Sequence, residues 1–178
     1  GVFELVVCPV ACESRASIKI PPATGSGAAF TLSAKAPGPW GNAITASITG
    51  RQVPTGKKTA EGADETRAVF DLTLRYMGTA YTEVHRNLSV DTGDQIRNAR
   101  DVLAAQSQLV RIDEARDKLK QPKDSPDTTA AGGAAYALAG ATDATPDAYR
   151  AAIALLENEA DGDMVLVSVQ DTTDTTRV

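Results

Sequence analysis

FTLSAKAPGPWGNAITASI, residues Phe30 to Ile48, is the stretch that decides the fold. Two runs that alternate apolar and polar residues, as β-strands do, flank an insert that holds the only Trp of the chain. In this insert, Pro37 to Asn42, two prolines restrict φ and remove two backbone donors, and Gly38 and Gly41 are expected to supply the positive φ of a tight reversal. A large aromatic side chain on such a corner is expected to anchor it, so Trp40 should pin the corner against a sheet.

Further alternating runs lie on both sides of this stretch. We interpret residues 13–112 as an antiparallel β-sandwich domain with strands over 16–20, 28–36, 42–49, 68–77, 80–88 and 108–112. A covering helix is predicted over about 94–106, entered at the turn-forming residues 91–94. Gly50 to Arg67 is polar and without periodicity, which predicts an exposed loop at the end of a hairpin.

The two ends of the chain have a different pattern. The charged segment 113–135, with Pro122 and Pro126, is interpreted as a linker. Residues 136–178 then contain a helix signal over 147–159, with Thr145 as N-cap before a Pro, and an apolar strand over 164–169. This region reads as the start of an α/β core, to which residues 1–12, with the apolar run Val2 to Val7, would contribute a strand. The predicted fold class is therefore mixed α+β, with an antiparallel β-sandwich inserted into or flanked by parts of an α/β core.

Composition limits the function classes. With 178 residues, of which 42% are hydrophobic, the chain can bury a core of one domain or one and a half. A net charge of -5 argues against non-specific binding to nucleic acid or anionic membranes, which needs a basic face. No apolar run approaches the roughly 20 residues of a membrane-spanning helix, so we expect no membrane insertion. Because the chain starts at Gly1, without Met, inside an apolar run, we interpret it as an internal fragment of a longer protein.

Metal binding is weakly supported by the sequence. Cys8 and Cys12 would supply two ligands, and the only His, His85, lies in a distant segment, so a tetrahedral zinc site cannot be closed. A disulfide between these cysteines would need a tight turn at Pro9, and we favour small buried thiols in a reducing compartment. The four carboxylates Asp161, Asp163, Asp171 and Asp174 lack the spacing of a calcium loop and leave only an adventitious cation open.

Catalytic signals are equally sparse. Alternation places His85 on one face with Glu83 and Asn87, which we expect to be solvated, and no Gly-x-Ser-x-Gly elbow accompanies it. Gly132-Gly133 lacks the Lys-Ser/Thr of a phosphate loop. We therefore expect no catalytic residue, cofactor site or metal site. The rival enzymatic hypothesis requires a cleft that gathers His85 with a Ser or Cys and a carboxylate.

The stretch around the Trp also carries a family resemblance. Phe30 to Lys35 followed by Pro37 to Asn42 resembles a segment of contractile tail sheath proteins, which occur in contractile-tailed phages, R-type bacteriocins and extracellular contractile injection systems. Further segments resemble that family in the same order, namely 70–74, 83–89, 106–110, 138–143 and 149 with 155–157. The chain departs from the family at Ala141 and Ala144, where Gly is usual, and sheath proteins are considerably longer.

The resemblance implies a structural function. It implies an internal fragment carrying the β-sandwich and the first part of a core with subtilisin-like topology and no peptidase activity. The residues that carry it as structural positions are Trp40, Gly38, Gly41, Asn42, Pro37, Asn87, Leu88, Gly140 and Asp143. Sheath subunits stack as hexameric rings around an inner tube and contract to drive that tube through a cell envelope, linked by terminal arms that would lie outside these residues.

The implied partners are other sheath subunits, the inner tube protein and the baseplate, without direct nucleic-acid contact. The implied location is the virion tail, or the bacterial cytoplasm during assembly. An alternative is a surface-exposed β-sandwich module for binding or decoration of a virion, whose segment Gly50 to Arg67 would contact a host surface or glycan.

Overall fold

A computed structural model describes residues 10, 12–77, 79–94, 97–125 and 135–156 of the chain. The chain divides into two compact units. One unit is Cys12–Asp143, and the other combines Gly1–Ala11 with Ala144–Val178. The candidate site lies in the unit Cys12–Asp143.

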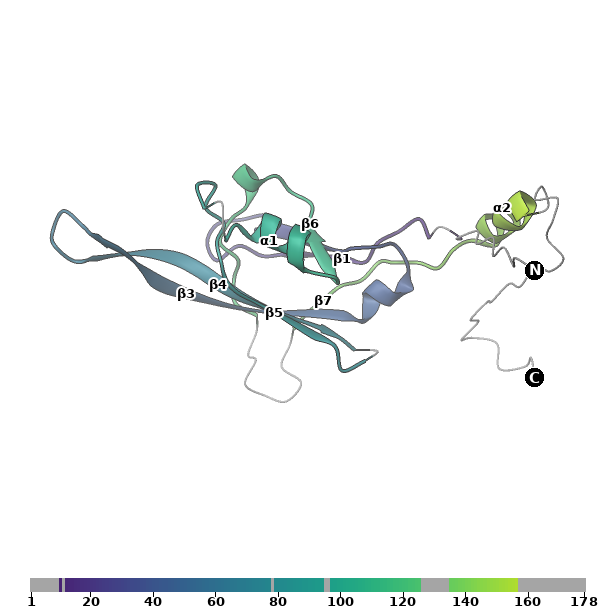
Figure 1. Cartoon of the computed structure of the whole chain (residues 1–178), viewed down its shortest axis with the longest axis horizontal. Helices are drawn as coiled ribbons and strands as arrows, with labels where there is room; N and C mark the ends of the chain where they lie inside the picture. The colour runs from purple at the N-terminus through teal and green to yellow at the C-terminus, as the bar shows by residue number, and fades with distance from the viewer. Residues whose placement is uncertain (1–9, 11, 78, 95–96, 126–134, 157–178) are drawn as a thin grey trace, which may run out of the picture. The chain divides into compact units, whose positions relative to one another are not determined.

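The unit Cys12–Asp143 contains two antiparallel sheets (Figure 1). The three-stranded sheet has the order β1-β2-β6, with β1 at Ser17–Ile20, β2 at Phe30–Ala34 and β6 at Val110–Ile112. The four-stranded sheet has the order β5-β4-β3-β7, with β5 at Thr82–Leu88, β4 at Asp64–Tyr76, β3 at Ile44–Lys58 and β7 at Tyr136–Ala137. The expectation of a mixed, mainly antiparallel fold is confirmed at this level.

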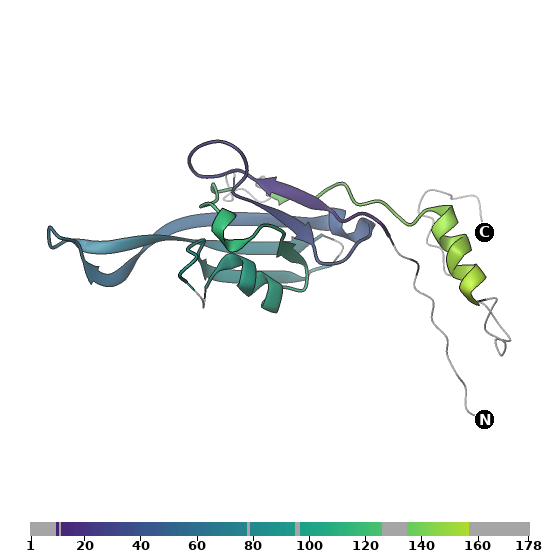
Figure 2. The same ribbon diagram turned by 90° about the horizontal axis from the view of Figure 1, so that it is seen from above.

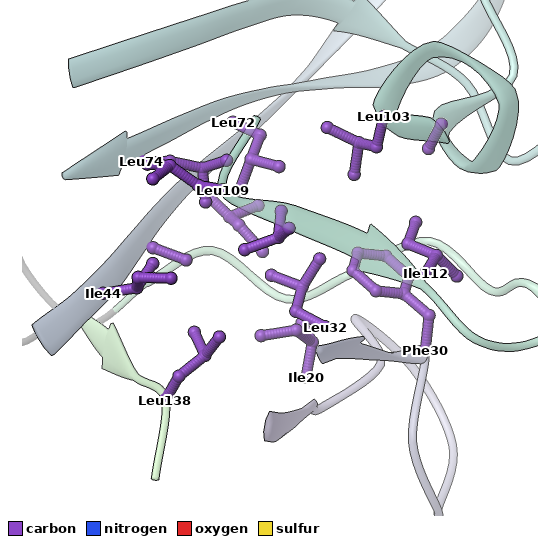
Figure 3. Packing of buried hydrophobic residues seen from close by; sticks show 14 of the residues in the cluster. Ile20, Phe30, Leu32, Ile44, Leu72, Leu74, Leu103, Leu109, Ile112 and Leu138 are labelled. Atoms are coloured by element: carbon purple, nitrogen blue, oxygen red, sulfur yellow. The ribbon is translucent and has the colours of Figure 1, made fainter. Parts of the chain in front are cut away.

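Side chains of both sheets meet in one hydrophobic core (Figure 3). The alternation of β4 places Phe70, Leu72 and Leu74 in this core, because successive side chains of a strand point to opposite faces. Phe30 of β2 stacks on Phe70 with ring centroids 5.9 Å apart, which joins the two sheets directly. The core is otherwise built from aliphatic side chains, including Leu32, Ile44, Leu103 and Leu138.

The helix α1, Ala99–Gln106, packs beside β6 (Figure 2). It is shorter than the helix predicted over 94–106. The Asp91 side chain accepts from Gly93 N at 2.9 Å and so forms a turn of its own instead of starting the helix. Asn98 is the N-cap, and its side chain accepts from Arg100 N at 3.2 Å. The apolar face of α1 then carries Leu103 into the core.

Most of the segment Gly50 to Arg67 belongs to strands, so the predicted loop is wrong. β3 and β4 continue as a two-stranded ribbon beyond the other strands, and only residues 59–63 connect them (Figure 1). The ribbon is polar because both of its faces are largely exposed, which removes the apolar periodicity that marks a strand. Backbone pairing and side-chain pairs such as Lys58 with Asp64, 2.6 Å apart, hold it together.

The described part of the expected linker, residues 113–125, packs against both sheets. Glu114 accepts from Thr31 N of β2 at 2.8 Å. The short 3-10 helix η2, Arg116–Lys118, follows, and Pro122 pairs with Pro22 beside β1. Ser125 N donates to Ile48 O of β3 at 3.0 Å. This segment therefore crosses from one sheet to the other.

In the second unit the structure describes the helix α2, Pro146–Leu156. The predicted N-cap is present, since Ala148 N donates to Thr145 Oγ1 at 3.2 Å. Helical spacing predicts one apolar face that includes Ala152 and Leu155, of which Ala152 is buried but Leu155 is 64% exposed. The strands predicted at 2–7 and 164–169, and the carboxylates after residue 160, lie outside the described residues. None of the described helices is long and apolar enough to cross a membrane.

Candidate functional site: a corner that ties the two ends of the sheet unit

The segment around the single Trp forms a compact corner between β2 and β3. Gly38 has a φ of 120°, the positive value expected there, and precedes the 3-10 helix η1, Pro39–Ala43. Trp40 Nε1 donates to Pro37 O at 3.1 Å, which closes the corner on itself. The indole packs against the core and meets the ring of Tyr76 edge-on, with centroids 6.3 Å apart.

Gly41 is required for a different reason from the one expected. It is not among the glycines with positive φ, so that part of the sequence interpretation is wrong. A Cβ on Gly41 would lie 2.8 Å from the Cβ atoms of both Ala16 and Ala34, well inside van der Waals contact. Because Gly41 has no side chain, the corner, which directly precedes β3 of the four-stranded sheet, can pack closely against the three-stranded sheet.

Asn42 joins the corner to a segment 99 residues later in the chain. Its Nδ2 donates to Ala141 O at 2.8 Å, and its Oδ1 accepts from Ala141 N at 3.0 Å. The amide side chain thus pairs with both backbone groups of Ala141, as a residue of a neighbouring strand would. Ala141 is one of the positions where the resembled family usually has Gly, and here it is buried.

The first residues of the unit lie beside the same segment. Thr142 N donates to Ser14 Oγ at 2.7 Å, and Ser17 and Ala139 exchange backbone hydrogen bonds of 2.8 and 3.2 Å. Ser14 O also accepts from Gly38 N at 3.0 Å, which brings in the corner. The two ends of the unit therefore run side by side and are both held at the corner.

Gly140 and Asp143 lie within this second segment. Gly140 has a φ of 90°, a conformation that favours glycine. The Asp143 carboxylate lies 4.0 Å from Cys12 Sγ, with the thiol as donor. Cys8, its expected neighbour, lies outside the described residues.

Asn87 and Leu88 form an irregularity at the end of β5. Asn87 has a φ of 56°, the only positive value among the described residues other than Gly. The pairing of β5 with β4 shifts by one residue here, from Leu72 opposite His85 to Phe70 opposite Leu88. Asn87 N donates to Asp71 Oδ1 at 2.7 Å, so a carboxylate of β4 holds the bulge, and Leu88 is completely buried.

This bulge overturns the expected placement of His85. His85 and Glu83 are buried, whereas Val84 between them is 52% exposed. Regular alternation put His85 on one face with Glu83 and Asn87, which was expected to be solvated. The extra residue of the bulge breaks this alternation, so that Glu83 and His85 are buried while Asn87 is exposed. An Asn in an alternating run is the one signal that could have indicated the bulge, because Asn tolerates positive φ.

The buried carboxylate of Glu83 lies within hydrogen-bond distance of groups from two chain segments. Ser107 Oγ donates to Oε2 at 2.6 Å, Gln108 N donates to Oε1 at 2.8 Å, and His85 Nε2 lies 3.1 Å from Oε2. Tyr81 OH donates to Oε1 at 3.3 Å. Glu83 thereby joins the edge strand β5 to the connection between α1 and β6, a role that the sequence analysis missed.

Protonation of Glu83 is governed by these contacts. Burial alone would raise its pKa, but the hydrogen bonds from Ser107, Gln108 and His85 outweigh burial and lower the pKa below its ordinary value. The same carboxylate acts on Tyr81, whose pKa is raised by desolvation and by the negative charge of Glu83. The carboxylate is therefore held ionised as a structural acceptor.

A Ser, a His and a carboxylate do lie together here, as the enzymatic hypothesis required, but in a different order. Nucleophile activation needs the His between the Ser and the carboxylate. Here Ser107 and His85 both bind Glu83, and Ser107 Oγ also accepts from Val110 N at 3.0 Å. The hydroxyl is thus used in a turn. Among the described residues no group of three or more His, Cys, Asp or Glu could hold a metal ion.

Comparison with known proteins adds no relative: no family model matches the chain, and no curated protein matches it.

Proposed function

We propose that this chain is a structural segment of a contractile tail sheath subunit. Such subunits polymerise as stacked rings around an inner tube and contract to drive it through a cell envelope. The proposal rests on the sequence resemblance centred on the Trp40 corner and on one structural observation, the pairing of the two ends of the unit Cys12–Asp143 at that corner. In this proposal the two sheets form a β-sandwich inserted into a core with subtilisin-like topology.

The paired ends support insertion for a geometric reason. A domain inserted into another fold must receive and return the chain at neighbouring points, or the host fold would be split. Asn42 binds both backbone groups of Ala141, and Ser14 binds Thr142, so the incoming and outgoing segments are held at hydrogen-bond distance. Force applied to either segment would reach the corner first and then the sheets as one body.

A mechanical role also fits the use of the polar residues. The buried hydroxyl, imidazole and carboxylate around Glu83 link β5 to the α1–β6 connection and satisfy one another. In the proposed function no bond is made or broken by this chain, and contraction draws on energy stored in the extended assembly. The partners would be other subunits, the inner tube and the baseplate.

Electron microscopy of the full-length parent protein, expressed alone, tests the proposal. We expect rings or striated tubes with sixfold symmetry. Asn42→Ala in the same protein should reduce the yield of tubes, because it leaves the buried Ala141 peptide without its two partners, whereas Gly93→Ala on an exposed turn should not. Failure of the full-length protein to form rings or tubes under any salt or precipitant condition would refute the sheath assignment.

A binding or decoration module is the second candidate, and the ribbon formed by β3 and β4 favours it. The ribbon extends beyond the other strands of the sheet (Figure 1). Its side chains are mostly polar and exposed, as those of a contact surface for a host or glycan would be. The same micrographs separate the two candidates, since a decoration module remains monomeric or attaches to virions without forming tubes. Shortening the ribbon between Gln52 and Thr66 would then abolish attachment.

A further inference from the structure

The outer edge of β5 carries unpaired backbone groups. β5 is the last strand of its sheet and pairs only with β4 among the described residues (Figure 1). Leu74 of β4 lies opposite Glu83, and Tyr76 N donates to Tyr81 O at 3.0 Å, so alternate residues of β5 beginning at 81 face β4. In an antiparallel ladder the intervening residues direct their N–H and C=O groups away from the partner strand. These residues are Thr82, Val84 and Arg86.

An apolar side chain is exposed on the same strand. Val84, in the middle of β5, is 52% exposed. Arg75 lies opposite Thr82 in the register, so alternation puts both side chains on the face that carries Val84. Exposed apolar groups on an unpaired strand edge are typical of a surface that accepts another strand.

Charge defines the partner. Arg75 and Arg86 are exposed on this face and form no ion pair with any described residue, in contrast to Arg51 on the same face, which contacts Asp71 at 3.2 Å. Two unpaired guanidinium groups on either side of Val84, in a protein of net charge -5, favour a partner with carboxylates at alternate positions.

We propose that the outer edge of β5 binds an extended acidic peptide segment of a partner protein, which adds to the four-stranded sheet as a further strand. Its backbone pairs with Thr82, Val84 and Arg86, its apolar side chain covers Val84, and its carboxylates meet Arg75 and Arg86. The ribbon edge is not equivalent, because Pro54 of β3 has no N–H to offer there. The inference does not depend on the sheath assignment.

Backbone amide hydrogen exchange of the whole chain, measured with and without a probe peptide, tests the proposal. The probe is an acetylated, amidated peptide of alternating Glu and Val, and the control peptide has Lys in place of Glu. We expect the acidic peptide to slow exchange of the Val84 amide, and Arg86→Glu to weaken binding by about tenfold or more, since it replaces attraction by repulsion. The Lys peptide should give no protection.

Two variants at one position isolate the backbone contribution. Val84→Pro removes the outward N–H while leaving the hydrogen bonds to β4 in place, and it should abolish protection of Thr82 and Arg86 by the peptide. Val84→Thr keeps the N–H and should bind. If Val84→Pro fails to fold, Arg86→Glu still tests whether the acidic peptide binds at the edge of β5. The proposal is overturned if the acidic peptide protects no β5 amide, or if the Lys peptide binds equally well. It is also overturned if protection of the β5 amides rises with protein concentration alone, because the occupant would then be a second copy of the chain.

Discussion

Gly41→Ala gives the most direct measure of how closely the corner packs. The new Cβ would lie 2.8 Å from the Cβ atoms of Ala16 and Ala34, which are both completely buried. Ordinary contact between such carbons is about 3.5–4.0 Å, so the corner must move by roughly 1 Å relative to the three-stranded sheet. Nothing flexible is available to yield, because both neighbours are Cβ atoms attached directly to the backbone.

The expected cost follows from this geometry. Overpacking a buried position typically destabilises a protein by about 1–3 kcal/mol. Replacing Gly by Ala also lowers the entropy of the unfolded chain, which returns about 0.4–1 kcal/mol. We therefore expect a net loss of about 1–2 kcal/mol, which for a chain of this size lowers the melting temperature by about 2–8 °C.

Differential scanning calorimetry of the whole chain measures this loss. Gly93→Ala is the matched control, because Gly93 is exposed, has no positive φ, and its nearest atom to a new Cβ is at an ordinary 3.4 Å. Ala34→Gly should destabilise the wild-type protein but partly restore Gly41→Ala, since it removes one of the two clashes. Equal melting temperatures for Gly41→Ala and Gly93→Ala would refute the close-packing argument.

Three further predictions concern other parts of the same unit. Trp40→Ala should lower the free energy of unfolding by about 2 kcal/mol, and the melting temperature with it, because the ring is only partly buried. Trp40→Phe, which keeps a ring beside Tyr76, should lower both less. An unchanged melting temperature for Trp40→Ala would show that the ring does not anchor the corner. Folding lowers the pKa of Glu83 from its ordinary 4.5. The ionised carboxylate therefore contributes its full stabilisation of the fold above pH 4.5, and this contribution is lost as the pH falls through the pKa of Glu83 in the folded protein. Urea unfolding at several pH values should therefore show Glu83→Gln to be less stable at neutral pH with a flatter acid dependence, and parallel curves would contradict this. Asn87→Ala should cost about 1–2 kcal/mol through the positive φ, whereas Asn87→Gly should cost less, and the reverse order in thermal melting would exclude backbone strain as the reason for Asn.

Local patterns in the sequence predicted the parts of the fold that depend on local forces. Period-two alternation located the strands around Phe30, Ile44 and Phe70, because one apolar face per strand is what a core requires. Thr145 before Pro146 likewise gave the N-cap of α2, since capping involves only neighbouring residues. Boundaries were less accurate where two start signals compete, as at Asp91 and Asn98 before α1.

Alternation failed where the backbone departs from a regular strand or where no face is buried. The single positive φ at Asn87 reversed the face of everything before it in β5, so a residue pattern read without the bulge put His85 in solvent. The prediction for the ribbon of β3 and β4 failed for a different reason. Its strands are exposed on both faces, and backbone pairing alone leaves no mark in the apolar pattern.

The corner combines both situations. Its local stiffness was visible in Pro37, Gly38 and Trp40, but the partners that give it a function are remote in the chain: Ala16 and Ala34 for Gly41, and Ala141 for Asn42. A glycine needed for close approach looks the same in sequence as a glycine needed for positive φ, so only the packing separates Gly41 from Gly38.

Because the remote partner of Asn42 lies where the chain leaves the unit, loss of the Asn42 side-chain amide should loosen both ends of the unit together while the sheets stay paired. Asn42→Ala should therefore speed exchange of the Thr142 and Ala139 amides before that of Leu72, and simultaneous acceleration of all three would place the corner inside the cooperative core instead.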